Sequence, residues 1–295
     1  MHKSIDEFLS ALKRELEGCD KALIQDALSD AEEHINTALE NILSKKQNIT
    51  EDEAFSFVIE NYGEPLEIAD EYKKIEEYLK PVLAPSKKTD KQPGWKKFFL
   101  IISDPLAWGA SLYMLISIIT GIIYGTWIIC GLSISIPLLI FIIGIPIAGL
   151  FLLSVRGIAL LEGRLVETLL GIRMPRKPMF MSKDKGGWGK FKALVSSGIT
   201  WKAIIYMLLQ MGLGIFYFTL IITFFAVSLS LIAAPILELV FHLPMEINGT
   251  DAYTHKWILP LLPIVGALLL ISTLHLAKLF GYLHGMFAKL MLVKK

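Results

Sequence analysis

The sequence is poor in cysteine, which limits what can hold the chain together. Its 295 residues include only Cys19, in a charged N-terminal region, and Cys130, at the end of a long apolar run. We expect these two thiols to lie in different compartments, which argues against a disulfide framework. We also expect no cleavable signal peptide, because the N-terminus is amphipathic and charged, and we therefore expect residues 1–80 to stay in the cytosol.

Sequence motifs for catalysis or cofactor binding are equally scarce. No nucleophile, base and oxyanion donors form a recognisable constellation, and no cofactor fingerprint is present. Residues 186–190 are rich in glycine, but Asp184 and Phe191 stand where a phosphate loop requires Gly and Ser or Thr. We therefore predict a protein without enzymatic activity, without a cofactor and without a catalytic or structural metal.

Charged side chains are nearly absent from the long apolar runs. Lys202 and His275 are the exceptions, each near one end of its run. Because ionisable groups inside a membrane usually mark transport pathways, their scarcity argues against a proton- or ion-coupled transporter.

What the sequence does contain is apolar surface, in a chain with two unlike ends. Hydrophobic residues make up 54% of the chain and the mean hydropathy is +0.54. Residues 1–80 hold 20 acidic and 9 basic residues, a net charge of −11, while the rest of the chain carries +12. This pattern predicts an acidic soluble head followed by a basic membrane body.

The membrane body contains an internal repeat. Residues 108–129 recur as residues 201–222, an offset of 93, with 11 of 22 positions identical. Residues 152–170 resemble residues 274–292 at an offset of 122, so the second copy carries about 29 extra residues between its two spans. Extra residues in one copy of a repeat are usually a loop, and loops are where function often diverges.

Four membrane spans are predicted, near residues 106–129, 133–154, 202–225 and 257–277. The apolar stretch 226–241 contains Pro235 and Glu238 and is short for a crossing. This stretch fits an extension of the third span or an interfacial segment, and a fifth span is a further alternative. Residues 158–172 and 279–292 are predicted to be amphipathic helices lying at the cytoplasmic surface.

Basic residues predict the orientation of these spans. Nine Lys and Arg residues lie between residues 155 and 201, whereas the 226–256 connection carries only Lys256. The positive-inside rule therefore predicts a multi-pass protein of the cell membrane with both termini in the cytoplasm.

The head is predicted to be a small helical bundle. Apolar residues recur at helical spacing, Asp20 can cap the second helix, and Thr50 with Glu53 forms a capping box before a third. The expected fold class is all-α, a cytosolic bundle followed by a polytopic domain of two two-span repeats with interfacial amphipathic helices. The expected domains are the head (1–80), a Pro/Lys-rich linker (81–97), membrane repeat 1 (98–175), a basic loop (176–200) and membrane repeat 2 (201–295), with an inserted extracytoplasmic loop at about 226–256.

Two family resemblances emerge from particular motifs. Residues 4–80, with Glu53-Ala54 followed by Tyr62-Gly63-Glu64-Pro65, resemble the HAAS-type helical domain found at the N-terminus of prokaryotic membrane proteins. Residues 95–293, with Asp104-Pro105, Arg156-Gly157 and the run 228–235, resemble the family called Putative sensor. These resemblances imply a role in sensing and signalling.

Small residues recur every fourth position in the first span, at Ser117, Gly121 and Gly125, and Gly214 is the counterpart of Gly121 in the repeat. This spacing lets a second helix approach closely, so we predict a packing contact within or between the repeats rather than a conduction path.

Two further sets of residues are candidates for binding. In the inserted loop, the side chains that could bind a ligand or a metal are His242, Glu246, Asp251 and His255, although a solvated loop is the simpler interpretation. On the second helix an acidic face, formed by Asp26, Asp30, Glu33 and His34, is a candidate partner surface.

The leading hypothesis is a membrane sensor that passes a membrane or envelope cue to a cytosolic protein, a transcription regulator or a kinase, through its head. A transporter or an accessory subunit of an export complex is the alternative. The lipid bilayer is itself a partner, direct binding of nucleic acid is not expected, and homo-oligomer formation is left open.

Overall fold

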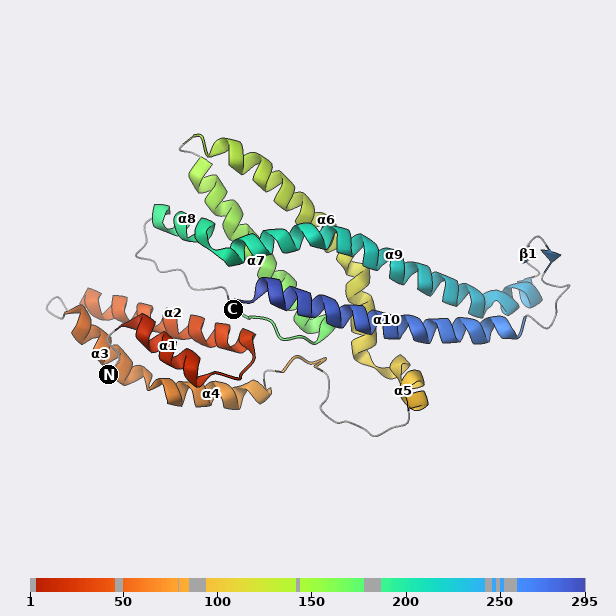
Figure 1. Cartoon of the computed structure of the whole chain (residues 1–295), viewed down its shortest axis with the longest axis horizontal. Coiled ribbons are helices and arrows are strands. Elements are labelled where there is room, and N and C mark those ends of the chain that lie inside the picture. Colours follow the sequence, from red (N-terminus) through yellow and green to blue (C-terminus); the bar gives the residue numbers. More distant parts are fainter. Residues whose placement is uncertain are drawn as a thin grey trace. The chain divides into compact units, whose positions relative to one another are not determined.

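A computed structural model describes residues 4–45, 50–78, 80–84, 94–141, 144–177, 187–241, 246–247, 250–251 and 259–294. The described part is all-α apart from a pair of two-residue antiparallel strands, β1 (Glu246–Ile247) and β2 (Thr250–Asp251). The predicted all-α class is therefore confirmed, and Figure 1 follows the helices along the chain.

Four helices form the head: α1 (Ile5–Glu15), α2 (Lys21–Lys45), α3 (Glu51–Tyr62) and α4 (Pro65–Tyr78). The predicted capping box is present, because Thr50 Oγ1 accepts the N–H of Glu53 while the Glu53 carboxylate accepts the N–H of Thr50. Helix α2 packs on α1 and α3, and α1 packs on α4. Their apolar faces enclose a core of their own, in which Phe8, Leu12 and Ile35 are fully buried.

Four of the remaining helices are long and apolar enough to cross a membrane: α6 (Pro105–Leu138), α7 (Gly144–Leu170), α9 (Gly198–Phe241) and α10 (Leu261–Leu292). These four helices of the described part of the chain fit the predicted multi-pass membrane protein. The predicted second span began too early, because residues 133–138 belong to α6 and α7 begins at Gly144. Two short helices, α5 (Gly94–Leu100) and α8 (Gly187–Ser196), precede α6 and α9, and a 3₁₀ turn, η1 (Ile101–Ser103), follows α5.

The long helices extend past the predicted span ends. Residues 158–170 and 279–292 continue α7 and α10 without a break, so they are not separate amphipathic helices. Residues 226–241 likewise continue α9, which settles that stretch as an extension of the third helix and shortens the predicted loop. A span needs about 20 residues, so the 44 residues of α9 are more than a crossing requires.

The chain divides into two compact units. The first comprises Met1–Val82, Trp127–Tyr206 and Phe287–Lys295, and the second comprises Leu83–Thr126 and Met207–Met286. Both predicted membrane repeats contribute residues to each unit. The head thus belongs to the first unit, together with α7, the segment that follows it and the last residues of α10.

Candidate docking site of the head

The site is built on a short basic segment, residues 171–177, that leaves the end of α7. Gly171 adopts a positive φ of 66°, which redirects the chain at the point where the helix stops. The carboxylate of Glu167, only 5% exposed, then accepts Arg176 Nη2 at 2.8 Å and Arg164 Nη1 at 2.9 Å. The bond from Arg176 holds the segment against α7, and Arg164 Nη2 also donates to the carbonyl of Arg176 at 2.8 Å.

Helix α2 of the head presents its acidic face to this segment. The Asp26 carboxylate accepts the backbone N–H of Arg176 at 2.7 Å and that of Lys177 at 3.2 Å. The Lys177 ammonium forms an ion pair with Asp30, whose other oxygen accepts the Tyr72 hydroxyl at 2.8 Å. Two carboxylates one helical turn apart therefore hold consecutive residues of the basic segment.

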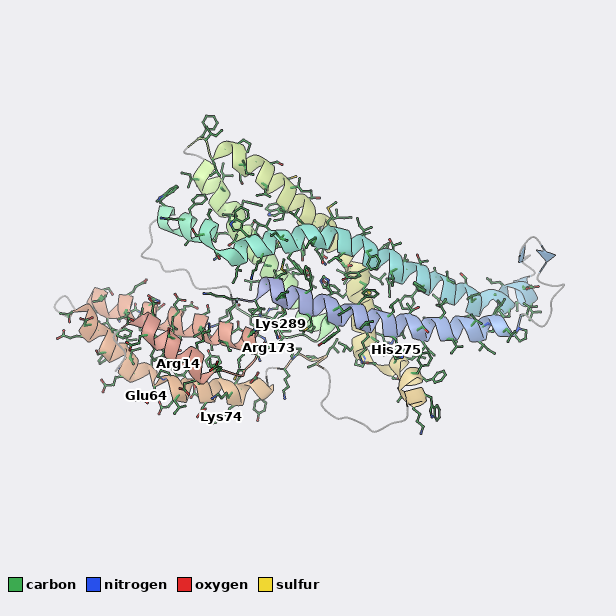
Figure 2. The ribbon with its side chains drawn as sticks, viewed as in Figure 1. Arg14, Glu64, Lys74, Arg173, His275 and Lys289 are labelled. Carbon is green, nitrogen blue, oxygen red and sulfur yellow. The ribbon has the colours of Figure 1, made fainter. Side chains whose placement is uncertain are left out.

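The last turn of α10 and a residue just after it make two more contacts with the head, at the start of α2. Lys289 Nζ donates to Asp20 at 2.5 Å, and the backbone N–H of Lys294 donates to the Gln25 side chain at 2.9 Å. Asp20 also caps α2, since its other carboxylate oxygen accepts the N–H of Ala22 at 2.9 Å. Figure 2 labels Lys289 and Arg173 in this part of the first unit.

Burial dominates the electrostatics at Asp26. Its side chain is 7% exposed, and loss of water raises its pKa, although the two backbone N–H bonds and the charge of Arg173 act in the opposite direction. Arg173 is also 7% exposed, and none of its guanidinium nitrogens has a hydrogen-bond partner among the described residues. It therefore stabilises the Asp26 carboxylate through space. The hydrogen bond to Asp30 raises the pKa of Lys177.

The predicted partner surface is divided by this arrangement. Asp26 is buried against the basic segment, whereas Glu33 and His34 are exposed. Asp30, Glu33, His34, Tyr62 and Lys177 line a groove of about 460 Å³. The His34 ring stacks on Tyr62 at a centroid distance of 4.6 Å, and burial raises the pKa of Tyr62 to about 12.

The predicted packing residues meet where α6 crosses α9 in the second unit. A methyl group on Gly121 would lie 2.6 Å from the carbonyl oxygen of Gln210, and one on Gly214 would overlap the carbonyl oxygen of Ser117. Gly125 faces the flexible side chain of Met211. The two helices therefore approach closely through Gly121 and Gly214, with backbone opposite each glycine.

Two buried polar contacts were not predicted from the sequence. In the second unit the Tyr113 hydroxyl lies 2.6 Å from His284 Nε2 and accepts Gln210 Nε2 at 3.1 Å. In the first unit the Tyr206 hydroxyl donates to Glu162 at 2.9 Å, and Glu162 is fully buried although it lies in the stretch 158–172 that was predicted to be a surface helix.

The sequence held a signal for these pairs. Tyr113 and Tyr206 are 93 residues apart and Glu162 and His284 are 122 apart, the two offsets of the repeat. Tyr113 of the first copy thus contacts His284 of the second copy, and Tyr206 of the second copy contacts Glu162 of the first. Glu162 and His284 differ in kind, so identical residues in the two copies of the repeat do not point to these pairs.

The candidate ligand loop is only partly described. His242 and His255 lie outside the described residues, and at Glu246 and Asp251 the backbone alone is described, within β1 and β2. Among the described residues, no three His, Cys, Asp or Glu side chains are grouped so that they could hold a metal ion.

Fold and site define a multi-pass membrane protein with an N-terminal helical head. The profile of the family described as Putative sensor matches residues 113–292, more than half of the chain. The chain therefore belongs to this family, and membership indicates a sensor role. No curated protein and no solved structure matches the chain.

Proposed function

We propose that this protein is a non-enzymatic sensor of the cell membrane whose head switches between a docked and a released state. In the docked state the basic segment 171–177 covers part of the acidic face of α2. A membrane cue that favours the released state uncovers that face for a cytosolic protein partner. A cue can shift such an equilibrium only by its differential affinity for the two states.

The observation that carries this proposal is the engagement of Asp26 and Asp30 by residues 176 and 177. The Lys177–Asp30 ion pair is partly exposed, and exposed ion pairs are worth little, about 0.2–1 kcal/mol. The two bonds of the buried Asp26 carboxylate are exchanged for bonds to water when the head leaves, so their net contribution is also modest. A docked state held in this way is stable enough to be populated and weak enough to be reversed. The resemblance of residues 4–80 to the HAAS-type domain supports a signalling role for the head.

The partner is proposed to be basic where it meets the head, because the uncovered face carries Asp26, Asp30 and Glu33. A transcription regulator or a kinase fits this role. We expect residues 1–80, which contain their own core, to capture one specific cytosolic protein in a salt-sensitive manner, and to capture more of it than the full-length protein does.

Charge reversal tests where the partner binds. Glu33→Lys should abolish capture by the fragment, whereas Glu15→Lys, an equal charge change at an exposed position of α1, should leave it unchanged. Capture is measured by pull-down and mass spectrometry. Equal capture by both variants would remove the acidic face from the proposal, and copurification of the full-length protein with transporter subunits would favour an export-accessory role.

Both termini are proposed to lie in the cytoplasm, on the basis of the lysine and arginine asymmetry. In a background without Cys19 and Cys130, a single cysteine replacing Ser4, Ser182 or Lys295 should resist an impermeant thiol reagent in intact cells. A cysteine replacing Thr250 should react. Labelling at Ser182 without permeabilisation would reverse the proposed orientation.

Duplication is proposed as the origin of the membrane body, and matching contacts support it. Trp108 Nε1 donates to the carbonyl of Ile102 at 2.7 Å, and Trp201 Nε1 donates to that of Val195 at 2.8 Å, both pairs being displaced by 93 residues. The Gly121–Gln210 and Gly214–Ser117 approaches are related by the same offset.

A further inference from the structure

The first unit contains a cavity beside the docking site of the head. Its volume is about 400 Å³, within the range of small-ligand sites. The second half of α7, the basic segment, the start of α9, one residue of α2 and one of α10 form its walls. The walls are largely apolar, with Leu153 and Leu160 from α7 and Ile199 from α9.

Two positively charged side chains lie among these apolar residues. Arg156 and Lys177 both line the cavity, and no aspartate or glutamate is among its lining residues in the described part of the chain. Arg156 Nε donates to the Thr200 hydroxyl at 3.2 Å, which orients the guanidinium. A guanidinium and an ammonium together are suited to a phosphate group, which an arginine can bind through two parallel hydrogen bonds.

The place of Arg156 along α7 further limits which kind of ligand the cavity can bind. Residues 144–155 of α7 carry no charge, and Arg156 is the first charged residue after them. Those residues rise only about 18 Å, less than a full crossing. The long arginine side chain extends toward the headgroup layer, and basic pockets between membrane helices bind anionic headgroups. A ligand that filled this cavity would therefore be apolar over most of its length and anionic at one end.

We propose that the cavity binds one anionic phospholipid, with its phosphate at Arg156 and Lys177 and acyl carbon atoms along Leu153 and Leu160. The charge of the wall selects an anionic headgroup over a zwitterionic one. The apolar walls select a lipid over inorganic phosphate, which would leave most of the cavity unfilled.

The same lipid would act on the head, a regulatory step that rests on the proposed function. Lys177 forms an ion pair with Asp30 and also lines the cavity, and Gln25 both lines the cavity and accepts the N–H of Lys294. A phosphate that recruits the Lys177 ammonium competes with Asp30 for it. Binding of the lipid therefore weakens docking, and the cue that the protein senses is the anionic lipid content of its own leaflet.

Lipid binding is tested on the full-length protein in detergent by native mass spectrometry, with dioleoyl phosphatidylglycerol as the titrated probe. Arg156→Gln and Gly157→Leu should each weaken binding about ten-fold, the first by removing a charge-assisted bond and the second by filling the cavity. A methyl group on Gly157 would meet nothing within 4 Å, so the larger side chain enters open space.

Gly212→Leu is the matched control, because it adds the same side chain at a helical glycine that also has open space around it. It should bind phosphatidylglycerol as the wild type does. Equal binding of phosphatidylcholine, displacement of the lipid by inorganic phosphate, or undiminished binding by Gly157→Leu would each overturn the lipid site.

The regulatory step is tested separately in nanodiscs. Lys21 and Lys294 line one groove, so cysteines at these positions, in a background without Cys19 and Cys130, report docking through a short bifunctional maleimide. Phosphatidylglycerol should lower crosslinking several-fold relative to phosphatidylcholine in this protein and not in its Arg156→Gln variant. Unchanged crosslinking with lipid bound would refute lipid control of the head, while crosslinking that falls in both proteins alike would refute control through this cavity.

Failure of the proposed function has a different signature. The charge reversal Lys177→Glu should disturb docking in phosphatidylcholine nanodiscs, without phosphatidylglycerol. If that variant leaves crosslinking unchanged, the docked and released states are wrong whatever the lipid result. If it lowers crosslinking while phosphatidylglycerol fails to bind, the switch stands and the lipid site is wrong.

Discussion

Lys177→Glu is expected to lower crosslinking between cysteines at positions 21 and 294 about five- to thirty-fold. The substitution removes the ion pair with Asp30 and places a carboxylate beside Asp26 and Asp30. The Lys177 side chain is 52% exposed, so the lost attraction is worth at most about 1 kcal/mol, and the new repulsion contributes a similar amount. A change of about 1–2 kcal/mol shifts a two-state ratio by that factor.

Lys192→Glu is the matched control for this experiment. Lys192 is an exposed residue of α8, in the same connection between α7 and α9, and its replacement makes the same change in net charge. It should leave crosslinking at the wild-type level. A fall of similar size in both variants would mean that the net charge of the connection, rather than the contact of Lys177 with α2, determines docking.

Gly214→Ala is expected to destabilise the packing of the membrane helices strongly, although it adds only one methyl group. The new Cβ would overlap the carbonyl oxygen of Ser117, a backbone atom that cannot rotate away. The crossing of α6 and α9 must therefore widen, and overpacking of this kind costs about 1–3 kcal/mol or more. Thermal unfolding of the full-length protein in detergent should show a clearly lowered midpoint.

Neighbouring glycines supply a graded series for the same measurement. Gly121→Ala should match Gly214→Ala, since its Cβ would lie 2.6 Å from the Gln210 carbonyl oxygen. Gly125→Ala should cost less, because the atoms it meets belong to the flexible Met211 side chain. Gly212→Ala meets nothing within 4 Å and should be neutral or slightly stabilising, as alanine favours a helix. Equal midpoints for Gly212→Ala and Gly214→Ala would show that the close approach has no energetic role.

Local pattern accounts for what could be predicted about the fold. The apolar runs give four helices long enough to cross a membrane, and the capping box at Thr50 begins α3 at Glu51. Both signals are local, because they depend on hydrogen bonds and side-chain periodicity among residues close in sequence and not on tertiary contacts. The helix ends were less predictable, because α7 and α10 continue through residues whose mixed polarity suggested separate helices.

The sequence by itself determined the helices, the acidic character of α2 and the four-residue spacing of small residues in α6. Tertiary structure alone decided that Asp26 is buried against Arg176, 150 residues away, while Glu33 stays exposed, and that Glu162 lies with Tyr206. The physical reason is that a carboxylate can be buried only where donors and countercharges replace its water. Those groups come from other helices, so no local pattern specifies them.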